Sequence, residues 1–229
     1  MGQLSTLSVA VLPEALMAAF SRNARVITLR RGQFIAMTGT VADEVFLTLS
    51  GRVQATVISP NGRETILREV SAGQLIGDFA ALGGATRSTN IVARDAARLA
   101  GISGASFHKI VTGNEAVAAW MMASLVGQLR TMSQRYYEIS TLGVGLRVCA
   151  ELHRLCQARG FTDGPAEIDA APTHSEIAAL IGANRESVTR ELNELSARGL
   201  ISQTGRKLRI ASVERLTAIV ERQSAGGIS

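Results

Sequence analysis

The stretch that decides the fold is residues 173–190, THSEIAALIGANRESVTR. Thr173 and Glu176 have the spacing of a capping box, in which a hydroxyl and a carboxylate satisfy free backbone amides at a helix start. Apolar residues then recur at helical spacing until Gly182, where glycine ends the first helix. A second helix is predicted from Arg185 to Arg198. Two short helices joined by such a turn form a helix-turn-helix.

The surrounding sequence predicts the rest of a winged domain. Short apolar stretches follow the second helix on both sides of a glycine turn, which is typical of a small hairpin. The expected elements are a helix over 145–159, a short strand over 166–169, a wing over 199–210 with its turn at 204–206, and a last helix over 213–222 capped by Ser212.

The chemistry of this domain lies at the start of its second helix. Arg185, Glu186 and Arg190 fall outside the apolar stripe of Val188, Leu192 and Leu195. An arginine fork matches guanine O6 and N7 in the major groove, and a glutamate accepts from the cytosine amino group. Residues 184–209 carry six basic and three acidic side chains, a net charge of +3. The sequence therefore predicts double-stranded DNA as a partner, although a solvated charged face is the alternative.

Before the winged domain, the sequence predicts an antiparallel β-barrel or jelly roll. From Arg25 to Ile102, short stretches of Val, Ile, Leu and Thr are punctuated by glycine every 7–12 residues or so. Asn61-Gly62 predicts a hairpin, because both residue types tolerate a positive φ. Alternation at Val45, Leu47 and Leu49 indicates a strand with one buried face.

A long helix is predicted over residues 114–141. Its apolar residues recur every seven positions, which favours packing against a parallel copy; the alternative is a helix that lies on its own barrel. The heptad residues are Ala118, Leu125, Met132 and Ile139, with Met122, Leu129 and Tyr136 between them. Gly143 and Gly145 mark a hinge after this helix.

The run from Glu176 to Arg190 resembles the signature of the CRP/FNR family of bacterial transcription regulators. In that family the matching positions contact bases of a TGTGA-type half-site on a two-fold palindrome, which implies a homodimer and, as a further partner, RNA polymerase. The DNA-binding residues that we expect are Thr173, Arg185, Glu186, Ser187, Arg190, Arg206 and Lys207. Thr173 and the two wing cations are expected to hold phosphates, which set register.

The resemblance extends into the barrel, where Gly73-Gln-Leu-Ile-Gly77-Asp78 and Arg87-Ser88-Thr89 are similar to the cyclic-nucleotide-binding domain. The family's nucleotide binders hold the cyclic phosphate at the positions of Arg87 and Ser88, and the ribose at those of Gly77 and Asp78. Independently, an arginine and a neighbouring hydroxyl suit a phosphate. The ligand-binding residues that we expect are Gly77, Asp78, Phe79, Arg87, Ser88, Thr89, Met132 and Ser133.

Two departures from the family pattern affect this site. Asp78 stands where the nucleotide binders carry glutamate, so the carboxylate is one methylene shorter. Met132 and Ser133 stand where the best-known cAMP binder has Thr-Ser facing the purine, and only Ser133 can hydrogen-bond a base. The expected effector is therefore cAMP or cGMP, with no tightly bound cofactor. The alternative for the barrel keeps Arg87 as a structural salt bridge, partnered by Asp78.

Composition excludes several other classes of protein. Cys149 and Cys156 are too few for a zinc or iron–sulfur centre and predict two buried helix thiols. His108, His153 and His174 are scattered, so no metal site is expected. The longest apolar stretch is too short to span a bilayer, and no signal peptide is visible, which predicts a cytoplasmic protein. No nucleophile–base pair or phosphate-binding loop indicates an enzyme.

Taken together, the sequence predicts an α+β protein: an N-terminal antiparallel β-barrel or jelly roll, a long dimerisation helix and a C-terminal winged helix-turn-helix. We expect a sensor domain over 1–113, the dimerisation helix over 114–141 and the DNA-binding domain over 142–229. The expected function is a DNA-binding regulator controlled by a cyclic nucleotide. Two alternatives stay open: a regulator with no nucleotide ligand, and a nucleotide-binding adaptor whose winged domain binds protein.

Overall fold

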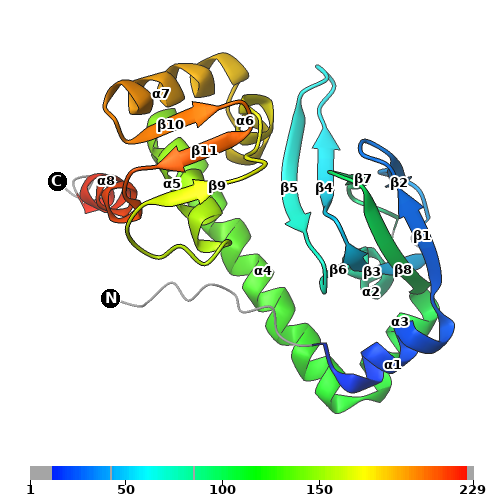
Figure 1. Cartoon of the computed structure of the whole chain (residues 1–229). Helices are drawn as coiled ribbons and strands as arrows, with labels where there is room; N and C mark the ends of the chain where they lie inside the picture. The colour runs from blue at the N-terminus through cyan, green and yellow to red at the C-terminus, as the bar shows by residue number, and fades with distance from the viewer. Residues whose placement is uncertain (1–11, 42, 85, 226–229) are drawn as a thin grey trace. The chain divides into compact units, whose positions relative to one another are not determined.

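The computed structural model describes residues 12–41, 43–84 and 86–225, with side chains up to residue 221. The chain divides into two compact units, which meet between Thr131 and Met132, inside a long helix. Figure 1 shows the helices and strands of each unit. The proposed division into a sensor domain, a dimerisation helix and a DNA-binding domain stays a prediction.

The N-terminal unit consists of antiparallel strands and helices. Its elements are α1 (Glu14–Asn23), β1 (Arg25–Leu29), β2 (Phe34–Ala36), β3 (Glu44–Ser50), β4 (Val53–Ile58), β5 (Glu64–Val70), β6 (Leu75–Ile76), α2 (Asp78–Gly83), β7 (Asn90–Ala93), β8 (Ala97–Ser103), α3 (Gly104–Gly113) and the first part of α4 (Glu115–Thr141). The strands form two four-stranded sheets, in the orders β1-β8-β3-β6 and β2-β7-β4-β5. The expected antiparallel β domain is thus confirmed.

Strand β3 is buried on both faces, which differs from the predicted single buried face. Val45 and Leu47 pack in a core cluster with residues of α1, α3 and α4. Phe46, which points the other way, packs in a second cluster between the two sheets. Of the three residues expected on the buried face, Leu49 at the end of the strand is exposed. Helices cover the face of the sheet that carries Val45 and Leu47.

The predicted hairpin is present, with a longer turn than expected. Strands β4 and β5 pair from Val53–Val70 to Ile58–Glu64. Five residues connect them, and the amide of Gly62 donates to the carbonyl of Ser59. Gly62 has φ +79°, whereas Ala170 is the one non-glycine residue with a positive φ in the described part of the chain. Asn61 therefore has a negative φ and helps through its side chain, which accepts from the amide of Arg63.

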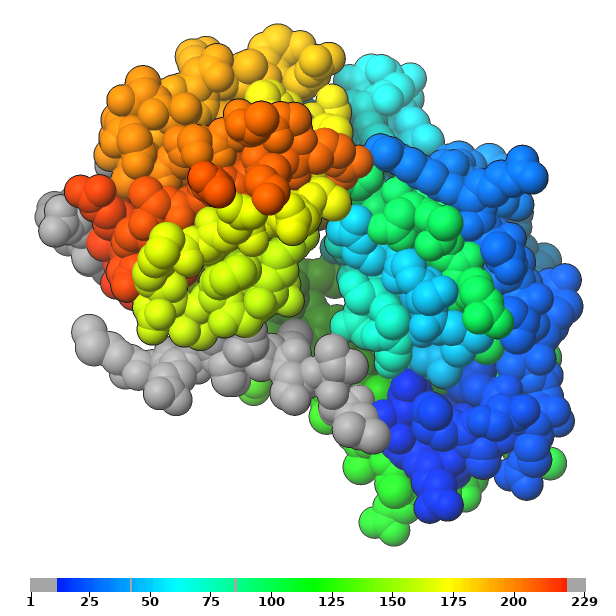
Figure 2. Space-filling view, in the orientation of Figure 1, coloured from blue at the N-terminus to red at the C-terminus, as the bar shows by residue number. Residues whose placement is uncertain are grey.

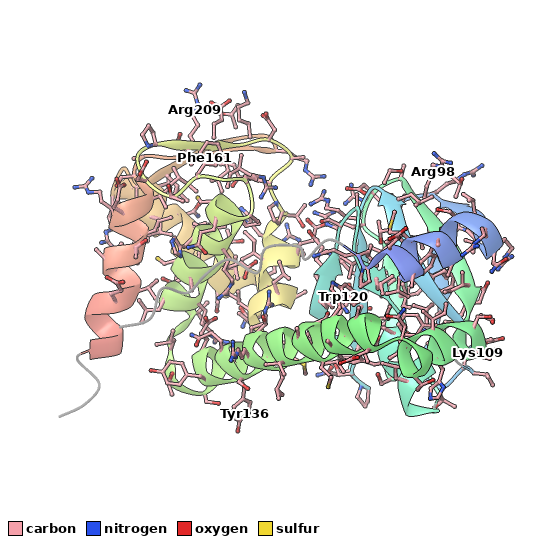
Figure 3. The ribbon with its side chains drawn as sticks, turned by 90° about the horizontal axis from the view of Figure 1, so that it is seen from below. Arg98, Lys109, Trp120, Tyr136, Phe161 and Arg209 are labelled. Atoms are coloured by element: carbon pink, nitrogen blue, oxygen red, sulfur yellow. The ribbon has the colours of Figure 1, made fainter. Side chains whose placement is uncertain are left out.

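Helix α4 matches the predicted helix over 114–141 and has two apolar faces in its N-terminal part. Val117 and Met121 are buried in the core of the N-terminal unit. Met122 and Leu129, two of the heptad residues, are more than half exposed. Figure 3 shows Tyr136, near the other end of α4, projecting outward from the helix. The helix thus covers its own domain with one face and leaves a second face open.

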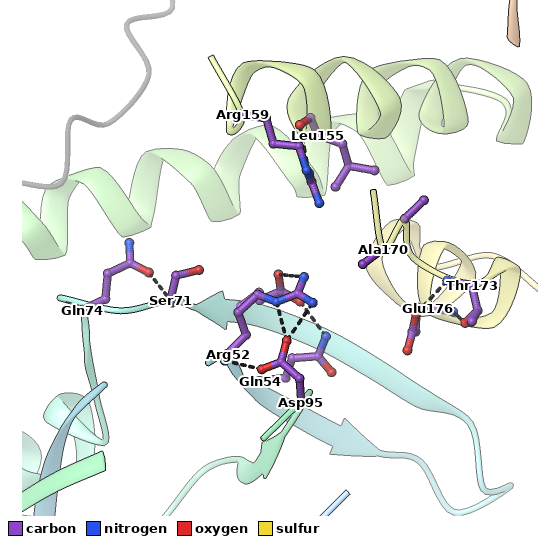
Figure 4. A network of polar contacts seen from close by, with 12 residues as sticks. Arg52, Gln54, Ser71, Gln74, Asp95, Leu155, Arg159, Ala170, Thr173 and Glu176 are labelled. Carbon is purple, nitrogen blue, oxygen red and sulfur yellow. Dashed lines mark hydrogen bonds and ion pairs between the residues drawn. The ribbon is translucent and has the colours of Figure 1, made fainter. Parts of the chain in front are cut away.

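The C-terminal unit contains the end of α4 and the winged domain. Its elements are α5 (Val144–Gln157), β9 (Ala166–Ile168), α6 (His174–Ile181), α7 (Arg185–Ala197), β10 (Ile201–Thr204), β11 (Lys207–Ile210) and α8 (Val213–Ala225). The hydroxyl of Thr173 accepts from the amide of Glu176, and the Glu176 carboxylate accepts from the amide of Thr173 at 2.7 Å, so the predicted capping box is confirmed. Figure 4 shows this pair at the start of α6.

The wing belongs to a larger sheet than predicted. Besides β10 and β11, the strand β9 pairs with β11, with Ile168 opposite Leu208. Ala166, Ile168, Leu208 and Ile210 are all buried in the core of the unit, which holds the hairpin against the helices. Figure 2 shows β10 and β11 at the surface of the unit.

Within the described residues, no single helix is long and apolar enough to cross a membrane. Helices α3 and α4 reach the required length and hydropathy only when taken together, across a bend of 108°.

Candidate functional site

The centre of the barrel site is Arg87, which lies between α2 and β7 and is 5% exposed. Its guanidinium donates to the carbonyls of Gly77 (3.2 Å) and Glu44, and lies 5.9 Å from the centre of the Phe46 ring. Its Nε is buried and has no hydrogen-bond partner among the described residues. Burial lowers the pKa of Arg87, against the attraction of nearby carboxylates. An anion would satisfy both the charge and the free N–H.

Gly77 brings the backbone close to this arginine. It has φ +90° and precedes α2, and an added Cβ would lie 2.4 Å from Nη1 of Arg87. The turn therefore requires glycine for its conformation as well as for space.

The other expected ligand-binding residues of the N-terminal unit differ in burial. Asp78 is buried, Thr89 is half-buried, and Phe79 and Ser88 are exposed. Burial raises the pKa of Asp78, and the positive charge of Arg68 and the side chain of Gln128 oppose that rise. Asp78 forms its ion pair with Arg68, at 3.5 Å, and not with Arg87 as the salt-bridge alternative required.

Met132 and Ser133 are both exposed on α4. They belong to the C-terminal unit, so their part in a ligand site stays a prediction.

The residues expected to read DNA lie on α7. Arg185, Glu186 and Arg190 are exposed, whereas Ser187 is half-buried. The helix starts at Asn184, whose side chain accepts from the amide of Ser187 at 2.8 Å. This cap was missed at the sequence level, although asparagine before a helix is a common signal. The predicted apolar stripe of α7 is buried in the unit core, so the charged side chains are turned outward.

The two wing cations are engaged within the unit. Arg206 donates to the carbonyl oxygens of Ala171 (3.1 Å) and Ala170 (3.4 Å). Lys207 Nζ lies 2.5 Å from a carboxylate oxygen of Glu167 and 3.6 Å from one of Asp169. A phosphate contact by either residue would have to compete with these interactions.

A side-chain link that the sequence did not reveal connects α6 and α7. His174 Nδ1 lies 2.9 Å from Oγ1 of Thr189, and the Thr189 hydroxyl donates to the Arg185 carbonyl. Since that hydroxyl proton is used, Nδ1 is the donor. In the neutral ring Nε2 is then an acceptor, so its 3.5 Å approach to Gln203 Oε1 is not a hydrogen bond. The histidine therefore helps to hold α7 against α6.

A buried polar cluster, also missed, surrounds Arg154 on α5. Its guanidinium reaches Glu138 on α4 (2.8 Å) and Glu151 on α5 (2.9 Å), and both carboxylates are almost fully buried. Arg135 lies 3.8 Å from Glu151 and donates to the carbonyl of Leu180 at the end of α6. This cluster ties the end of α4 to the winged domain.

No group of three or more His, Cys, Asp or Glu side chains in the described part of the chain is placed to hold a metal ion. Cys149 and Cys156 are free and buried, as predicted, and burial raises the pKa of each thiol to about 11.

A further group of ion pairs in the barrel is centred on Arg52. Arg52 binds Asp95 at 2.8 Å and approaches Glu69 at 3.5 Å (Figure 4). These groups tie strand β4 to its neighbours, and nothing in them resembles a ligand site.

Comparison with known proteins agrees with this geometry. A family model for the cyclic nucleotide-binding domain matches residues 26–114, and one for a Crp-like helix-turn-helix domain matches residues 146–219. The CRP-like cAMP-activated global transcriptional regulator of Mycobacterium tuberculosis is 25% identical over 207 residues, which cover 90% of this chain and 92% of that protein. The cAMP-activated global transcriptional regulator CRP of Escherichia coli is 26% identical over 171 residues, 74% of this chain and 81% of that protein.

Solved structures share the fold. FixK2 from Bradyrhizobium japonicum has a TM-score of 0.75 at 20% identity, covering 85% of this chain and 96% of that one. The c-di-GMP-responsive regulator CLP from Xanthomonas campestris has a TM-score of 0.72 at 19% identity, covering 86% and 98%. With a nucleotide-binding-like barrel followed by a Crp-like helix-turn-helix, and with regulators as its relatives, the chain belongs to the CRP/FNR family of transcription regulators, which are DNA-binding proteins and not enzymes.

Proposed function

We propose that this regulator is controlled by a cyclic nucleotide, cAMP or cGMP, bound in the barrel at Arg87. The observation that carries the proposal is a buried guanidinium whose Nε has no partner among the described residues. A buried polar group without a partner costs roughly 1–3 kcal/mol, and a ligand phosphate would remove that cost. The relatives named as cAMP-activated regulators support the same effector class.

The buried positive charge of Arg87 suits an anionic ligand. Asp78 is already paired with Arg68, and the other carboxylates that act on Arg87, those of Asp43 and Glu44, are not fully buried. A cyclic phosphodiester carries a single negative charge and would pair with the almost fully buried guanidinium. Desolvated charges are tolerated when they are paired in this way.

Calorimetry with cAMP and with cGMP tests this proposal. We expect wild-type protein to bind at least one of them and Arg87→Ala to lose most of the affinity. Arg63→Ala, which removes an exposed arginine from the β4–β5 turn, is the matched control and should bind normally. If neither nucleotide binds and Arg87→Ala behaves as wild type does, the barrel has no such ligand, and the chain binds DNA constitutively or answers another effector.

On the DNA side, we propose that α7 reads a TGTGA-like half-site in the major groove. The exposed forks of Arg185 and Arg190 and the carboxylate of Glu186 support this reading. Each good bidentate base contact contributes roughly 1–3 kcal/mol of discrimination. We propose that the DNA backbone is held in register by Ser187, Thr173 and the wing cations.

Gel shifts on a TGTGA palindrome and on single-base variants test the DNA contacts. Arg185→Ala should relax specificity at one guanine, whereas Lys207→Ala should weaken all sequences similarly. Equal binding of wild-type protein to scrambled DNA would contradict sequence reading and favour the alternative in which the winged domain binds a protein.

We further propose a homodimer in which the exposed face of α4 pairs with that of a second copy. Met122, Val126 and Leu129 are exposed along this face, and a two-fold protein suits a palindromic site, with half-sites about 34 Å apart. RNA polymerase as a further partner and a location in the bacterial cytoplasm are expectations that follow from acting on promoters.

A further inference from the structure

The barrel site contains a second arginine contact, to a buried carboxylate, that the resemblance did not imply. Arg68, on β5, reaches Asp78 at the start of α2, with 3.5 Å between Nη1 and Oδ1. Its Nη2 donates to the carbonyl of Leu75 at 2.9 Å, which fixes the guanidinium in place. The Asp78 side chain is 4% exposed. This carboxylate therefore has a charged partner before any ligand arrives.

The contact matters because of what the same carboxylate is expected to do. If the barrel binds a cyclic nucleotide, as proposed above, the resemblance implies that the position of Asp78 meets the ribose. In a 3′,5′-cyclic nucleotide the 3′ and 5′ oxygens of the ribose are both esterified, so the 2′-hydroxyl is the one free hydroxyl on the sugar. A carboxylate at this position can only recognise the ribose by accepting from that hydroxyl.

Arg68 already holds Oδ1 of this carboxylate, which weakens the carboxylate as an acceptor for the 2′-hydroxyl. A charged guanidinium in a desolvated site holds a carboxylate more strongly than a neutral hydroxyl does. Aspartate is also one methylene shorter than the glutamate usual in nucleotide binders, so it has less reach toward the sugar while it is held by β5. Gln128 on α4 adds a further polar partner for Asp78.

We propose that Arg68 is a specificity-determining residue that withdraws Asp78 from the ribose, so that the barrel distinguishes poorly between a cyclic nucleotide and its 2′-deoxy analogue. Recognition then rests on the phosphate at Arg87 and on the base. The inference rests on the proposed nucleotide function but makes a separate claim about its selectivity.

Calorimetry on the full chain with cAMP, 2′-deoxy-cAMP, cGMP and 2′-deoxy-cGMP measures this selectivity. For wild-type protein we expect the affinity ratio of ribo to deoxy ligand to stay within about 3-fold, because no charge-assisted bond to the hydroxyl is present. Arg68→Met keeps the apolar length of the side chain and frees Asp78. Because the pKa of Asp78 is raised by burial and Arg68 opposes that rise, the measurement is made at a pH high enough to keep this carboxylate ionised, where the ratio should rise to about 10–100-fold, the range of one charge-assisted hydrogen bond.

Two further variants keep the inference testable if Arg68→Met does not fold. Asp78→Asn should leave the wild-type ratio unchanged, because the carboxylate is not used for the sugar. Arg52→Met removes an arginine that pairs with Asp95 in the same barrel, and should also leave the ratio unchanged.

The results separate the two proposals. Absence of binding by any of the four ligands would overturn the nucleotide function itself. Binding by wild-type protein with a ratio of 10-fold or more, lost in Asp78→Asn, would overturn the inference about Arg68 and leave the nucleotide function in place.

Discussion

Replacing Arg154 by methionine should destabilise the C-terminal unit strongly. Arg154 bridges Glu138 on α4 and Glu151 on α5 at 2.8 and 2.9 Å. The two carboxylate side chains are only 7% and 5% exposed, and the arginine is 29% exposed. Methionine fills much of the same volume but removes the main charged partner of both carboxylates.

The size of the effect follows from the burial of these carboxylates. Removing one partner of a buried ion pair costs about 3–5 kcal/mol, because the remaining charge stays desolvated. Two contacts reduce this cost here. Arg135 lies 3.8 Å from Glu151, and the side-chain amide of Gln134 donates to Glu138 at 3.3 Å. We therefore expect a fall of about 3 kcal/mol in the free energy of unfolding, at the lower end of that range.

Urea unfolding followed by two optical probes measures this loss of stability and assigns it to the C-terminal unit. Trp120 is the only tryptophan and packs against the core of the N-terminal unit, so its fluorescence reports that unit. Far-ultraviolet circular dichroism reports both units. With a slope of about 2 kcal/mol per molar urea, the C-terminal transition should move by about 1.5 M, while the tryptophan transition moves less.

The matched control is Arg159→Met, which removes an exposed arginine from the turn directly after the same helix and should change stability by less than about 0.5 kcal/mol. A loss below about 1 kcal/mol in Arg154→Met would refute the reasoning, since the carboxylates would then have found water or other partners. Adding Glu138→Gln and Glu151→Gln to Arg154→Met should recover part of the loss, because neither side chain is then a buried carboxylate without its partner.

Three further predictions concern the barrel, the thiols and α4. Gly77→Ala should lower the free energy of unfolding by about 1 kcal/mol or more. It should also abolish nucleotide binding in calorimetry, because the alanine Cβ would lie 2.4 Å from Nη1 of Arg87. Normal binding would show that the arginine can move aside. Cys149 and Cys156, with pKa values raised to about 11 by burial, should be almost entirely protonated at pH 8 and react with a thiol reagent only in denaturant; fast labelling of the native protein would contradict this. Leu129→Glu, at a position 64% exposed on α4, should give a monomer in sedimentation while wild-type protein is dimeric, and a dimeric variant would place the seam elsewhere.

Local signals predicted much of the winged domain. The capping box at Thr173, the glycine at the end of α6 and the turn at Gly205 are all confirmed, because each depends on neighbours within a few residues. The apolar periodicity of α4 also predicted its length closely. Periodicity could not show that α4 has one face on its own domain and one exposed, since both faces are apolar.

The sites were predictable only in part. Arg87 and the exposed arginines of α7 could be chosen from the sequence, because the chemistry of a phosphate and of a guanine edge needs those residue types. Their neighbours could not: Arg68 reaches Asp78 across ten positions, and His174 reaches Thr189 across 15. No pattern of spacing encodes such pairs.

The amino-acid sequence by itself determined the order of elements, the helix caps, the turn glycines and the kind of chemistry at each end of the chain. These features depend on backbone preferences and on periodicity, which act over short distances. Only the tertiary structure decided which charges meet: Arg68 with Asp78, Arg154 with Glu138, and Lys207 with Glu167. Such pairs form where packing brings separate strands and helices within a few ångströms, and burial makes the carboxylates of Asp78 and Glu138 depend on their partners.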